Sequence, residues 1–340
     1  MHSNRSPAAP PGARPPRARR LAALITALGC VALISACGSS SKSKPSTTAK
    51  TTAKTTAKAS AALPGKGKPT IVLGDKNFSE EFILGELYAQ AFRAKGYTVV
   101  LKPNIGSSEL INRVLQAGQI NAYPEYLGEI ASTLAGYSKP LVSEAQTYNI
   151  AEAYETKHGF TIMTPVTPFE DKDEIAVLKS FAQKHHLTTI GQLKGLGPLK
   201  LGDYSAEETR YEGYLGLKEA YGDTNLQFVP LEAGGPIYQA LDSGQVQVAD
   251  VFSTDPELLS GKYTILSDPK HIFGFQHVGL VIKKSLLSQL GPAFSSTYAA
   301  VTKLLTTPVM QALNKAVVVD KVSPAQVAHA FLADNHLLSP

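Results

Sequence analysis

Two patterns of apolar residues alternate along the chain after residue 69. Short apolar runs such as TIVLGD at 70–75 are typical of buried strands. Each is followed by a longer segment in which apolar residues recur every three or four positions, as Phe82, Ile83 and Leu87 do. The longer segments are typical of amphipathic helices. Strands that alternate with helices predict an α/β fold with a largely parallel sheet.

The alternation restarts after residue 170 with the strand-like run EIAVLK, which indicates a second lobe of similar construction. Another strand-like run, HVGLVIKKS, begins at His277 and is followed by helices. We interpret it as the return of the chain to the first lobe. The prediction is a lobe 1 of residues 69–170 plus 278–340 and a lobe 2 of residues 171–277, joined by hinges near 170 and 277.

One segment occurs twice. Residues 115–129 read LQAGQINAYPEYLGE, and residues 241–255 read LDSGQVQVADVFSTD. Each copy ends a helix-like run, passes through a glycine and reaches an aromatic residue eight positions later, Tyr126 in one copy and Phe252 in the other. Ligands of α/β proteins bind at the carboxyl ends of strands. We therefore expect the two rings to line one cleft from opposite lobes. The alternative is two core aromatics with coincidental spacing.

The N-terminal region has a different character. A basic stretch precedes sixteen apolar residues, 21–36, which is the length of a signal peptide and less than the roughly 20 residues that span a bilayer. The run ends in ISAC, which resembles the lipobox of bacterial lipoproteins. We predict a lipoprotein signal peptide at 1–36 and a lipidated Cys37, which anchors the protein on the extracytoplasmic face of the cell membrane. A transmembrane anchor and twin-arginine export remain alternatives.

Residues 37–68 are predicted to be a disordered tether that starts at the lipidated cysteine. They consist mostly of Ser, Thr, Ala, Lys and Pro, with TTAK three times in succession, and offer little apolar surface to offset the entropy of ordering. Twelve of the 33 basic residues lie in 1–68, whereas all 28 acidic residues follow. Residues 69–340 therefore carry 21 basic against 28 acidic residues, a formal charge of −7. This charge argues against nucleic-acid binding.

Candidate catalytic and metal-binding groups are scarce. The only cysteines are Cys30, in the segment to be cleaved, and Cys37, so the mature chain has no disulfide and no cysteine–metal site. The folded part has no GxSxG, HExxH, P-loop or GxGxxG motif. His185 and His186 lie in a polar stretch that is typical of a surface. We predict no cofactor, no metal and no enzymatic activity.

Four segments resemble, in the same order, the substrate-binding proteins of ABC importers for glycine betaine, choline, carnitine and related osmoprotectants. They are GDKNFSEEFILGELYAQAFRAKGY, NIGSSELINRVLQAGQINAYPEYLGE, RYEGYLGLKEAYG and YQALDSGQVQVADVFSTD. The resemblance covers residues 70–335. It implies a type II periplasmic-binding-protein-like fold and a monomer that hands a small molecule to a permease. An enzyme or a sensor on the same bilobal frame is the alternative.

The resemblance also implies a ligand site between the lobes. In that family the usual site is a cage of tyrosines around a quaternary ammonium group, with basic side chains for a carboxylate. Tyr126 and Phe252 stand at cage positions, and Lys76 and Arg210 match the basic groups. A methylated cation has no N–H to donate, so aromatic faces supply the attraction, about 0.5 to 2 kcal/mol each.

Other positions depart from the family pattern. Asp173 and Gln276 stand where aromatic residues are common, and Phe275 is the candidate for the ring missing at Gln276. Glu129 replaces a small hydroxyl residue. The added carboxylates repel the carboxylate of glycine betaine and attract cations. The predicted ligand is a quaternary amine or similar osmoprotectant. The alternative is a more polar amine, guanidinium or hydroxyl-rich compound such as a polyphenol.

Overall fold

The structure, a computed structural model, describes residues 62–338 except residue 233. The predicted signal peptide, the predicted lipidation site Cys37 and most of the predicted tether lie outside the described residues. Within the described part of the chain, no helix is long and apolar enough to cross a membrane.

Ordered structure begins before the predicted end of the tether at residue 68. Residues 64–67 form a turn, in which the buried Gly65 donates its N–H to the carbonyl of Lys95 at 2.9 Å. A Cβ on Gly65 would lie 2.5 Å from the ring of Tyr97, so this turn packs directly on the folded lobe. The last residues of the predicted tether, 62–68, therefore belong to the folded structure.

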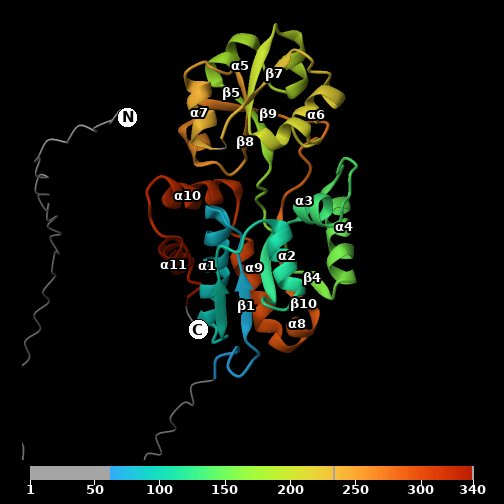
Figure 1. Ribbon diagram of the computed structural model, residues 1–340. Helices are drawn as coiled ribbons and strands as arrows, with labels where there is room; N and C mark the ends of the chain where they lie inside the picture. Colours follow the sequence, from blue (N-terminus) through green and yellow to red (C-terminus); the bar gives the residue numbers. More distant parts are fainter. Residues whose placement is uncertain (1–61, 233, 339–340) are drawn as a thin grey trace, which may run out of the picture. The chain divides into compact units, whose positions relative to one another are not determined.

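Lobe 1 is built on a sheet of five strands. Their order across the sheet is β2 (Val99–Lys102), β1 (Ile71–Gly74), β3 (Ala122–Tyr126), β10 (Val278–Lys283) and β4 (Phe160–Ile162) (Figure 1). Strand β1 is parallel to β2 and β3, whereas β10 runs antiparallel to β3 and β4. The chain thus returns to this sheet after building lobe 2.

Lobe 2 repeats this arrangement strand by strand. The order across its sheet is β7 (Leu226–Pro230), β6 (Leu199–Asp203), β8 (Val248–Phe252), β5 (Asp173–Leu178) and β9 (Tyr263–Leu266). Strand β6 is parallel to β7 and β8, and β5 runs antiparallel to β8 and β9. Strand β6 therefore corresponds to β1, β8 to β3, and β5 to β10.

Helices cover both faces of the lobe 1 sheet. They are α1 (Ser79–Ala94), α2 (Ser108–Gln116), α3 (Leu127–Glu129), a π-helical turn (Ile130–Leu134), α4 (Glu144–Lys157), α8 (Lys284–Leu290), α9 (Pro292–Thr302), α10 (Thr307–Val318) and α11 (Pro324–Asp334). Successive residues of β10 point to opposite faces, because side chains alternate along a strand. Leu280 packs with residues of α1 and α9, and Val281 packs with residues of α2 and α4.

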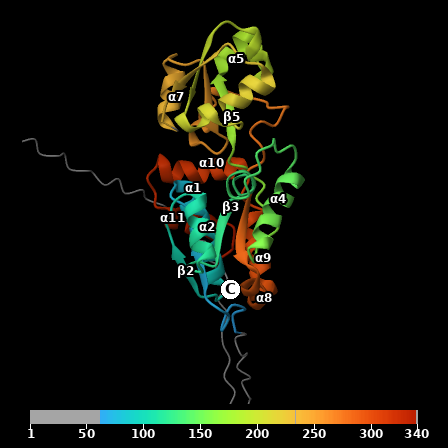
Figure 2. The same ribbon diagram turned by 45° about the vertical axis from the view of Figure 1, so that its right-hand side comes forward.

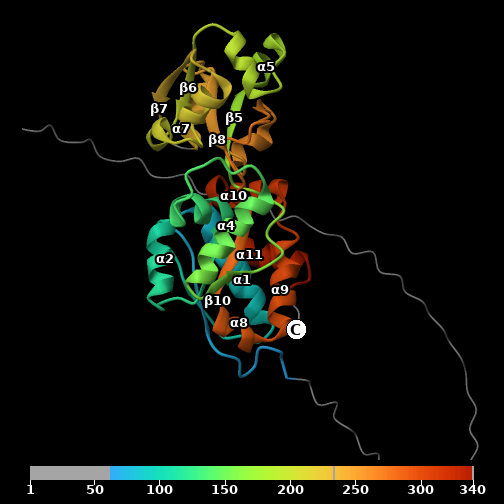
Figure 3. The ribbon, with the colours of Figure 1, turned by 90° about the vertical axis from the view of Figure 1, so that its right-hand side faces the viewer.

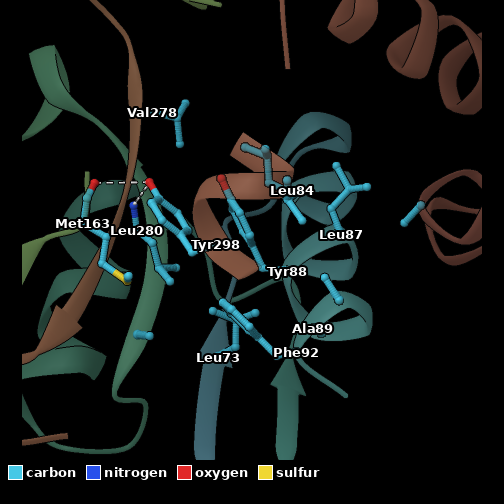
Figure 4. Packing of buried hydrophobic residues seen from close by; sticks show 14 of the residues in the cluster. Leu73, Leu84, Leu87, Tyr88, Ala89, Phe92, Met163, Val278, Leu280 and Tyr298 are labelled. Atoms are coloured by element: carbon cyan, nitrogen blue, oxygen red, sulfur yellow. Dashed lines mark hydrogen bonds between the residues drawn. The ribbon is translucent and has the colours of Figure 1, made fainter. Parts of the chain in front are cut away.

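Aromatic rings fill the core between the lobe 1 sheet and its helices α1 and α9. The ring of Tyr88 lies 5.3 Å from that of Tyr298, and the ring of Phe92 lies 4.2 Å from that of Phe294. The hydroxyl of Tyr298 donates to the carbonyl of Met163 at 3.2 Å (Figure 4). The buried hydroxyl group of Tyr298 thus has a hydrogen-bond partner. The core fixes β1 and α1, and thereby the loop that joins them.

Lobe 2 has shorter helices. They are α5 (Lys179–His185), α6 (Tyr214–Gly216), α7 (Gly235–Asp242), the 3-10 helices η2 (Ile190–Gly195), η3 (Ser205–Thr209) and η5 (Pro256–Ser260), and the π-helix η4 (Leu217–Tyr221). Ile175, Leu201 and Val248 from the three central strands form the middle of one core cluster. Ala176 and Ala249 pack against α7 on the other face.

Two chain segments, 163–172 and 267–277, connect the lobes. They meet where Glu170 and His277 form an antiparallel bridge and where the N–H of Asp171 donates to the carbonyl of Gln276 at 3.3 Å. Helix α10 of lobe 1 adds a third contact with lobe 2 (Figure 2, Figure 3). The amide of Gln311 in α10 donates to the carbonyl beyond the end of β8.

Both copies of the repeated segment adopt the predicted local structure. Gly118 lies between α2 and β3, and Gly244 lies between α7 and β8. Their φ angles are +70° and +75°, and no atom lies within 4 Å of a Cβ built at either position. Glycine is therefore required for the left-handed backbone and not for space. Each turn starts the strand that ends in one of the two predicted rings.

Candidate ligand-binding cleft

A cavity of about 1020 Å³ is lined by residues of both lobes. Tyr126, the last residue of β3, and Phe252, the last residue of β8, both belong to its lining. Both aromatic residues of the repeated segment therefore belong to the lining of one cavity. The volume is typical of a site for a small molecule.

Seven of the eight predicted site residues line this cavity, namely Lys76, Tyr126, Glu129, Asp173, Arg210, Phe252 and Gln276. Phe275 is the exception, because its ring lies on that of His271, with 5.3 Å between the centroids. Gly274 turns the chain here with a φ of +63°, and Phe273 lines the cavity instead. The structure therefore does not bring Phe275 to the position of the missing ring.

Acidic residues outnumber basic residues in the lining. The basic residues of the lining are Lys76, Lys139 and Arg210. The acidic residues are Glu80, Glu109, Glu129, Asp171, Asp173, Glu207, Glu212, Asp255 and Glu257. With nine acidic residues against three basic ones, the cleft attracts cations and disfavours anions.

Lys76 lies in the loop after β1, and its ammonium group is already paired. It donates to a carboxylate oxygen of Glu125 and to the hydroxyl of Ser108 at 3.3 Å, and Glu81 is 3.9 Å away. The residue is only 3% exposed. Burial lowers the pKa of Lys76, but the carboxylates of Glu125 and Glu81 outweigh burial, and the pKa is raised. The group expected to meet a ligand carboxylate is thus held by carboxylates of the protein.

The same ammonium group lies against two rings. Its nitrogen is 4.2 Å from the ring centroid of Tyr126 and 5.5 Å from that of Phe78. The two rings are stacked at 6.1 Å with an angle of 25°. The hydroxyl of Tyr126 donates to Glu80 at 2.7 Å, and the amide of Asn314 donates to the other oxygen of Glu80. Tyr126 is therefore fixed at both its face and its hydroxyl.

Lobe 2 presents a second pair of rings. The centroids of Tyr204 and Phe252 are 5.8 Å apart with an angle of 31°. Asp173 lies opposite Phe252 in the register of β5 and β8, and it accepts a hydrogen bond from the Tyr204 hydroxyl at 2.9 Å. A carboxylate and two aromatic faces thus meet at one wall of the cleft.

Three further carboxyl groups belong to the same part of lobe 2, and one of them, Glu207, also lines the cavity. Asp203 ends β6, Asp250 lies in β8, and Glu207 lies in η3, each at most 1% exposed. One oxygen of Asp203, one of Glu207 and both of Asp250 have no hydrogen-bond partner. Burial raises the pKa of Asp203 to about 8, with a further contribution from the charge of Glu207. Burial and the same neighbour raise the pKa of Asp173 well above its ordinary value.

Arg210 follows η3 and is the cation that faces these carboxyl groups. Its guanidinium donates to Glu207 at 2.7 Å, and its side chain is half exposed. The bond uses one of the two oxygens of Glu207 and leaves the other without a partner. Arg210 is thus engaged with the protein, as Lys76 is.

Gln276 and Glu129 meet at the junction of the lobes. The side-chain oxygen of Gln276 accepts from the N–H of Glu129 at 3.2 Å, and the N–H of Gln276 donates to Glu170 at 3.0 Å. A Cβ on Gly128 would lie 2.5 Å from the Gln276 amide, so a side chain at this position would displace that amide. Gln276 therefore links a connecting segment to lobe 1 and has no ring to offer a cation.

Sequence reasoning missed Tyr204, Phe78 and Glu207, which all line the cavity. A second internal repeat in the sequence could have predicted that Tyr204 lies in the cleft. Residues 73–75 read LGD, with Asp75 directly after β1, and residues 201–203 read LGD and end β6. The residue that follows each LGD lies in the cleft. Within residues 62–232 and 234–338, no group of three or more His, Cys, Asp or Glu could hold a metal ion.

Comparisons with known proteins bear on the family to which the chain belongs. The model of a family described as the substrate binding domain of ABC-type glycine betaine transport systems matches residues 69–334. The glycine-betaine-binding protein of Pseudomonas aeruginosa is 28% identical over 283 residues, which cover 79% of this chain and 89% of the relative. An ergothioneine transport permease/ergothioneine binding protein of Helicobacter pylori is 27% identical over 276 residues, 77% of this chain and 47% of the relative.

Solved structures confirm the predicted bilobal α/β fold. A crystal structure of a glycine betaine/carnitine/choline ABC transporter matches with a TM-score of 0.71 and 25% identity, over 79% of this chain and all of that chain. Substrate-binding proteins of ABC importers act outside the cytoplasm, where they bind small molecules and permease subunits. Because the family model spans most of the described residues, the chain belongs to the family of substrate-binding domains of ABC-type glycine betaine transport systems.

Proposed function

We propose that this protein captures a cationic small molecule, such as a quaternary amine, in the cleft and delivers it to the permease of an ABC importer. The observation that carries the proposal is the lining, in which nine acidic residues face three basic ones. Two of the three basic groups are already paired, Lys76 with Glu125 and Arg210 with Glu207. A bound cation supplies positive charge that the lining lacks.

Seven of the predicted residues are proposed to form the ligand site, namely Lys76, Tyr126, Glu129, Asp173, Arg210, Phe252 and Gln276. The aromatic residues of the lining support a cation, because a ring face attracts a desolvated positive charge. Asp173 and Glu129 add carboxyl groups at the same cleft, and a carboxyl group can pair with a bound cation. We also propose that the lobes close on the ligand about the connecting segments near residues 170 and 277, and that the protein acts as a monomer.

Glycine betaine is the second candidate, since the family and the Pseudomonas aeruginosa relative carry its name. It is a zwitterion, so its carboxylate must enter a cleft rich in carboxyl groups. Lys76 would have to leave Glu125 to bind that carboxylate, and Arg210 would have to bind it while it is still paired with Glu207. We therefore expect glycine betaine to bind more weakly than choline, which has the same trimethylammonium group without the carboxylate.

Thermal unfolding with a panel of small molecules tests the proposal. A ligand at 100 times its dissociation constant stabilises the folded state by about 2.7 kcal/mol. For a chain of this size, this stabilisation raises the unfolding midpoint by about 4 to 6 °C. We expect choline or another organic cation to produce such a shift and sodium acetate, the anionic control, to produce none. A panel in which no cation shifts the midpoint would refute the proposed ligand class.

The lipid anchor at Cys37 is a further part of the proposal and rests on the ISAC motif. The Cys37→Ser variant should incorporate no labelled fatty acid in its native host and should leave the membrane fraction. The matched control is Cys30→Ser, which alters the other cysteine of the chain, within the predicted signal peptide, and should leave labelling intact. Equal labelling of Cys37→Ser and wild type would place the lipid elsewhere or exclude it.

A further inference from the structure

The two lobes present corresponding strand ends to the cleft. Asp75 follows β1, and Asp203 ends β6, which has the same place in its sheet. The backbone carbonyl of Asp75 accepts from the N–H of Ile105 at 3.1 Å, and that of Asp203 accepts from Leu231 at 2.8 Å. In both aspartates, Oδ1 accepts a backbone N–H at 2.7 Å and Oδ2 has no partner. The two loops are thus equivalent at this point.

The next residue differs between the loops, with Lys76 in lobe 1 and Tyr204 in lobe 2. Each lobe nevertheless has a similar pair of rings. Phe78 and Tyr126 are 6.1 Å apart at 25°, and Tyr204 and Phe252 are 5.8 Å apart at 31°. In lobe 1 the Lys76 ammonium lies against both rings. Among the residues that the structure describes, no lysine or arginine nitrogen lies over the rings of the lobe 2 pair.

The carboxyl groups near the two pairs of rings also differ between the lobes. In lobe 1, Tyr126 pairs across the sheet with the apolar Val278, and Glu125 and Glu81 neutralise the ammonium group. In lobe 2, Phe252 pairs with Asp173. Glu207, 1% exposed and part of the lining, keeps one oxygen without a partner even though Arg210 binds the other. Lobe 2 has the rings and the acceptors of a cation site, and lobe 1 has these together with a cation of its own.

We propose that the positively charged group of the ligand binds to lobe 2, at the rings of Tyr204 and Phe252 and against Asp173, in the position that corresponds to Lys76 in lobe 1. Lys76 then acts as a specificity-determining residue, because its ammonium prevents the rings of Phe78 and Tyr126 from taking a ligand cation. The ligand is thereby oriented with its charged end toward lobe 2. This inference rests on the proposed function, since it assumes that the cleft binds a cation.

The Tyr204→Lys variant tests this assignment, because it gives lobe 2 the residue that lobe 1 has at the equivalent position. The new ammonium group can pair with Asp173 and Glu207 and take the place of the ligand cation. We expect calorimetry with choline and with agmatine to show at least a 100-fold loss of affinity for whichever probe binds wild type. Thr133→Lys is the matched control, because it adds the same charge at an exposed lobe 1 residue of the lining. It should cost only a few-fold.

Two further variants protect the test from a failure to fold. Tyr204→Phe keeps the ring and should stay within tenfold of wild type, whereas Tyr204→Leu removes the ring and should lose tenfold or more. If wild type binds neither probe, the proposed function falls and this inference with it. If wild type binds a probe and Tyr204→Lys or Tyr204→Leu binds it equally well, only the lobe 2 assignment is overturned.

Discussion

Replacement of Lys76 by Met is expected to lower the free energy of unfolding by about 3 to 5 kcal/mol, the cost of breaking a buried ion pair from one side. The Lys76 side chain is 4% exposed, and the Glu125 carboxylate with which it pairs is fully buried. Glu81, 3.9 Å from the ammonium group, is also fully buried. The variant leaves both carboxyl groups in the interior without their cation. Urea unfolding of the variant and of wild type at pH 7 measures the difference.

Two other variants separate the buried pair from a simple loss of charge. Lys262→Met breaks a solvent-exposed pair with Asp242 and should cost about 1 kcal/mol or less. Lys76→Met combined with Glu125→Gln removes both partners of the buried pair and should be more stable than Lys76→Met alone. A cost below about 1 kcal/mol for Lys76→Met would contradict the view that its ammonium balances these carboxylates.

The architecture could be predicted because its signals are local. The hydrophobic period of a strand or a helix is visible within a few residues. Gly118 and Gly244 each lie in a short link between a helix and a strand, where a glycine indicates a left-handed turn. The place of Tyr126 and Phe252 at the cleft then followed from one rule about strand ends. No long-range contact had to be known for these inferences.

The state of the charged groups could not be predicted in this way. Lys76 and Glu125 are 49 residues apart, and nothing in the sequence near either one identifies the other as its partner. A family resemblance places Lys76 at the cleft, but it does not show that a carboxylate of the protein holds the ammonium group. Arg210 and Glu207 are only three residues apart, so their ion pair could have been predicted from their spacing. The family resemblance instead assigned Arg210 to a ligand carboxylate.

The error at Phe275 has a backbone cause. The positive φ of Gly274 changes the chain direction between Phe273 and Phe275, so the earlier ring enters the cavity lining and the later one lies on His271. A pattern of residue types in FGFQH does not reveal which ring is turned inward. The predicted end of the tether at residue 68 was too late for a similar reason. Gly65 packs against Tyr97, and this contact cannot be read from the sequence around Gly65.

The carboxyl groups of lobe 2 make both stability and binding depend on pH. Burial, the largest cause, raises the pKa of Asp173, Asp203, Glu207 and Asp250. Repulsion from Glu207 raises the pKa of the three aspartates further, and repulsion from Glu212 does so for Glu207. The other groups that act on this set are Tyr204, Asp171, Glu212 and Arg210, of which Arg210 is the cation. Without a ligand, the folded protein therefore keeps protons that the unfolded chain releases near the ordinary carboxyl pKa. Stability of the free protein should fall as pH rises from 5 through the pKa of about 8 of Asp203.

Cation affinity should change with pH in the opposite sense. A positive charge against Asp173 favours its ionised form, so binding expels protons that the free protein holds, and the affinity rises with pH until the free protein has lost them. For each proton released, we expect the affinity for choline to rise by up to about tenfold per pH unit between pH 6 and 8. Calorimetry at pH 6, 7 and 8, in buffers with different ionisation enthalpies, gives both the affinity and the number of protons released.

The matched control for this second prediction is Glu155→Gln. Glu155 is fully buried in α4 outside the cavity lining, and burial raises its pKa to about 8. Its replacement should flatten the pH dependence of stability and leave that of choline affinity unchanged. Asp173→Asn should instead weaken choline binding at pH 8 and reduce proton release, because the carboxyl group beside the cation is lost. An affinity that stays constant or falls between pH 6 and 8 would mean that the ligand does not displace protons from these carboxyl groups. The bound cation would then have to lie away from Asp173.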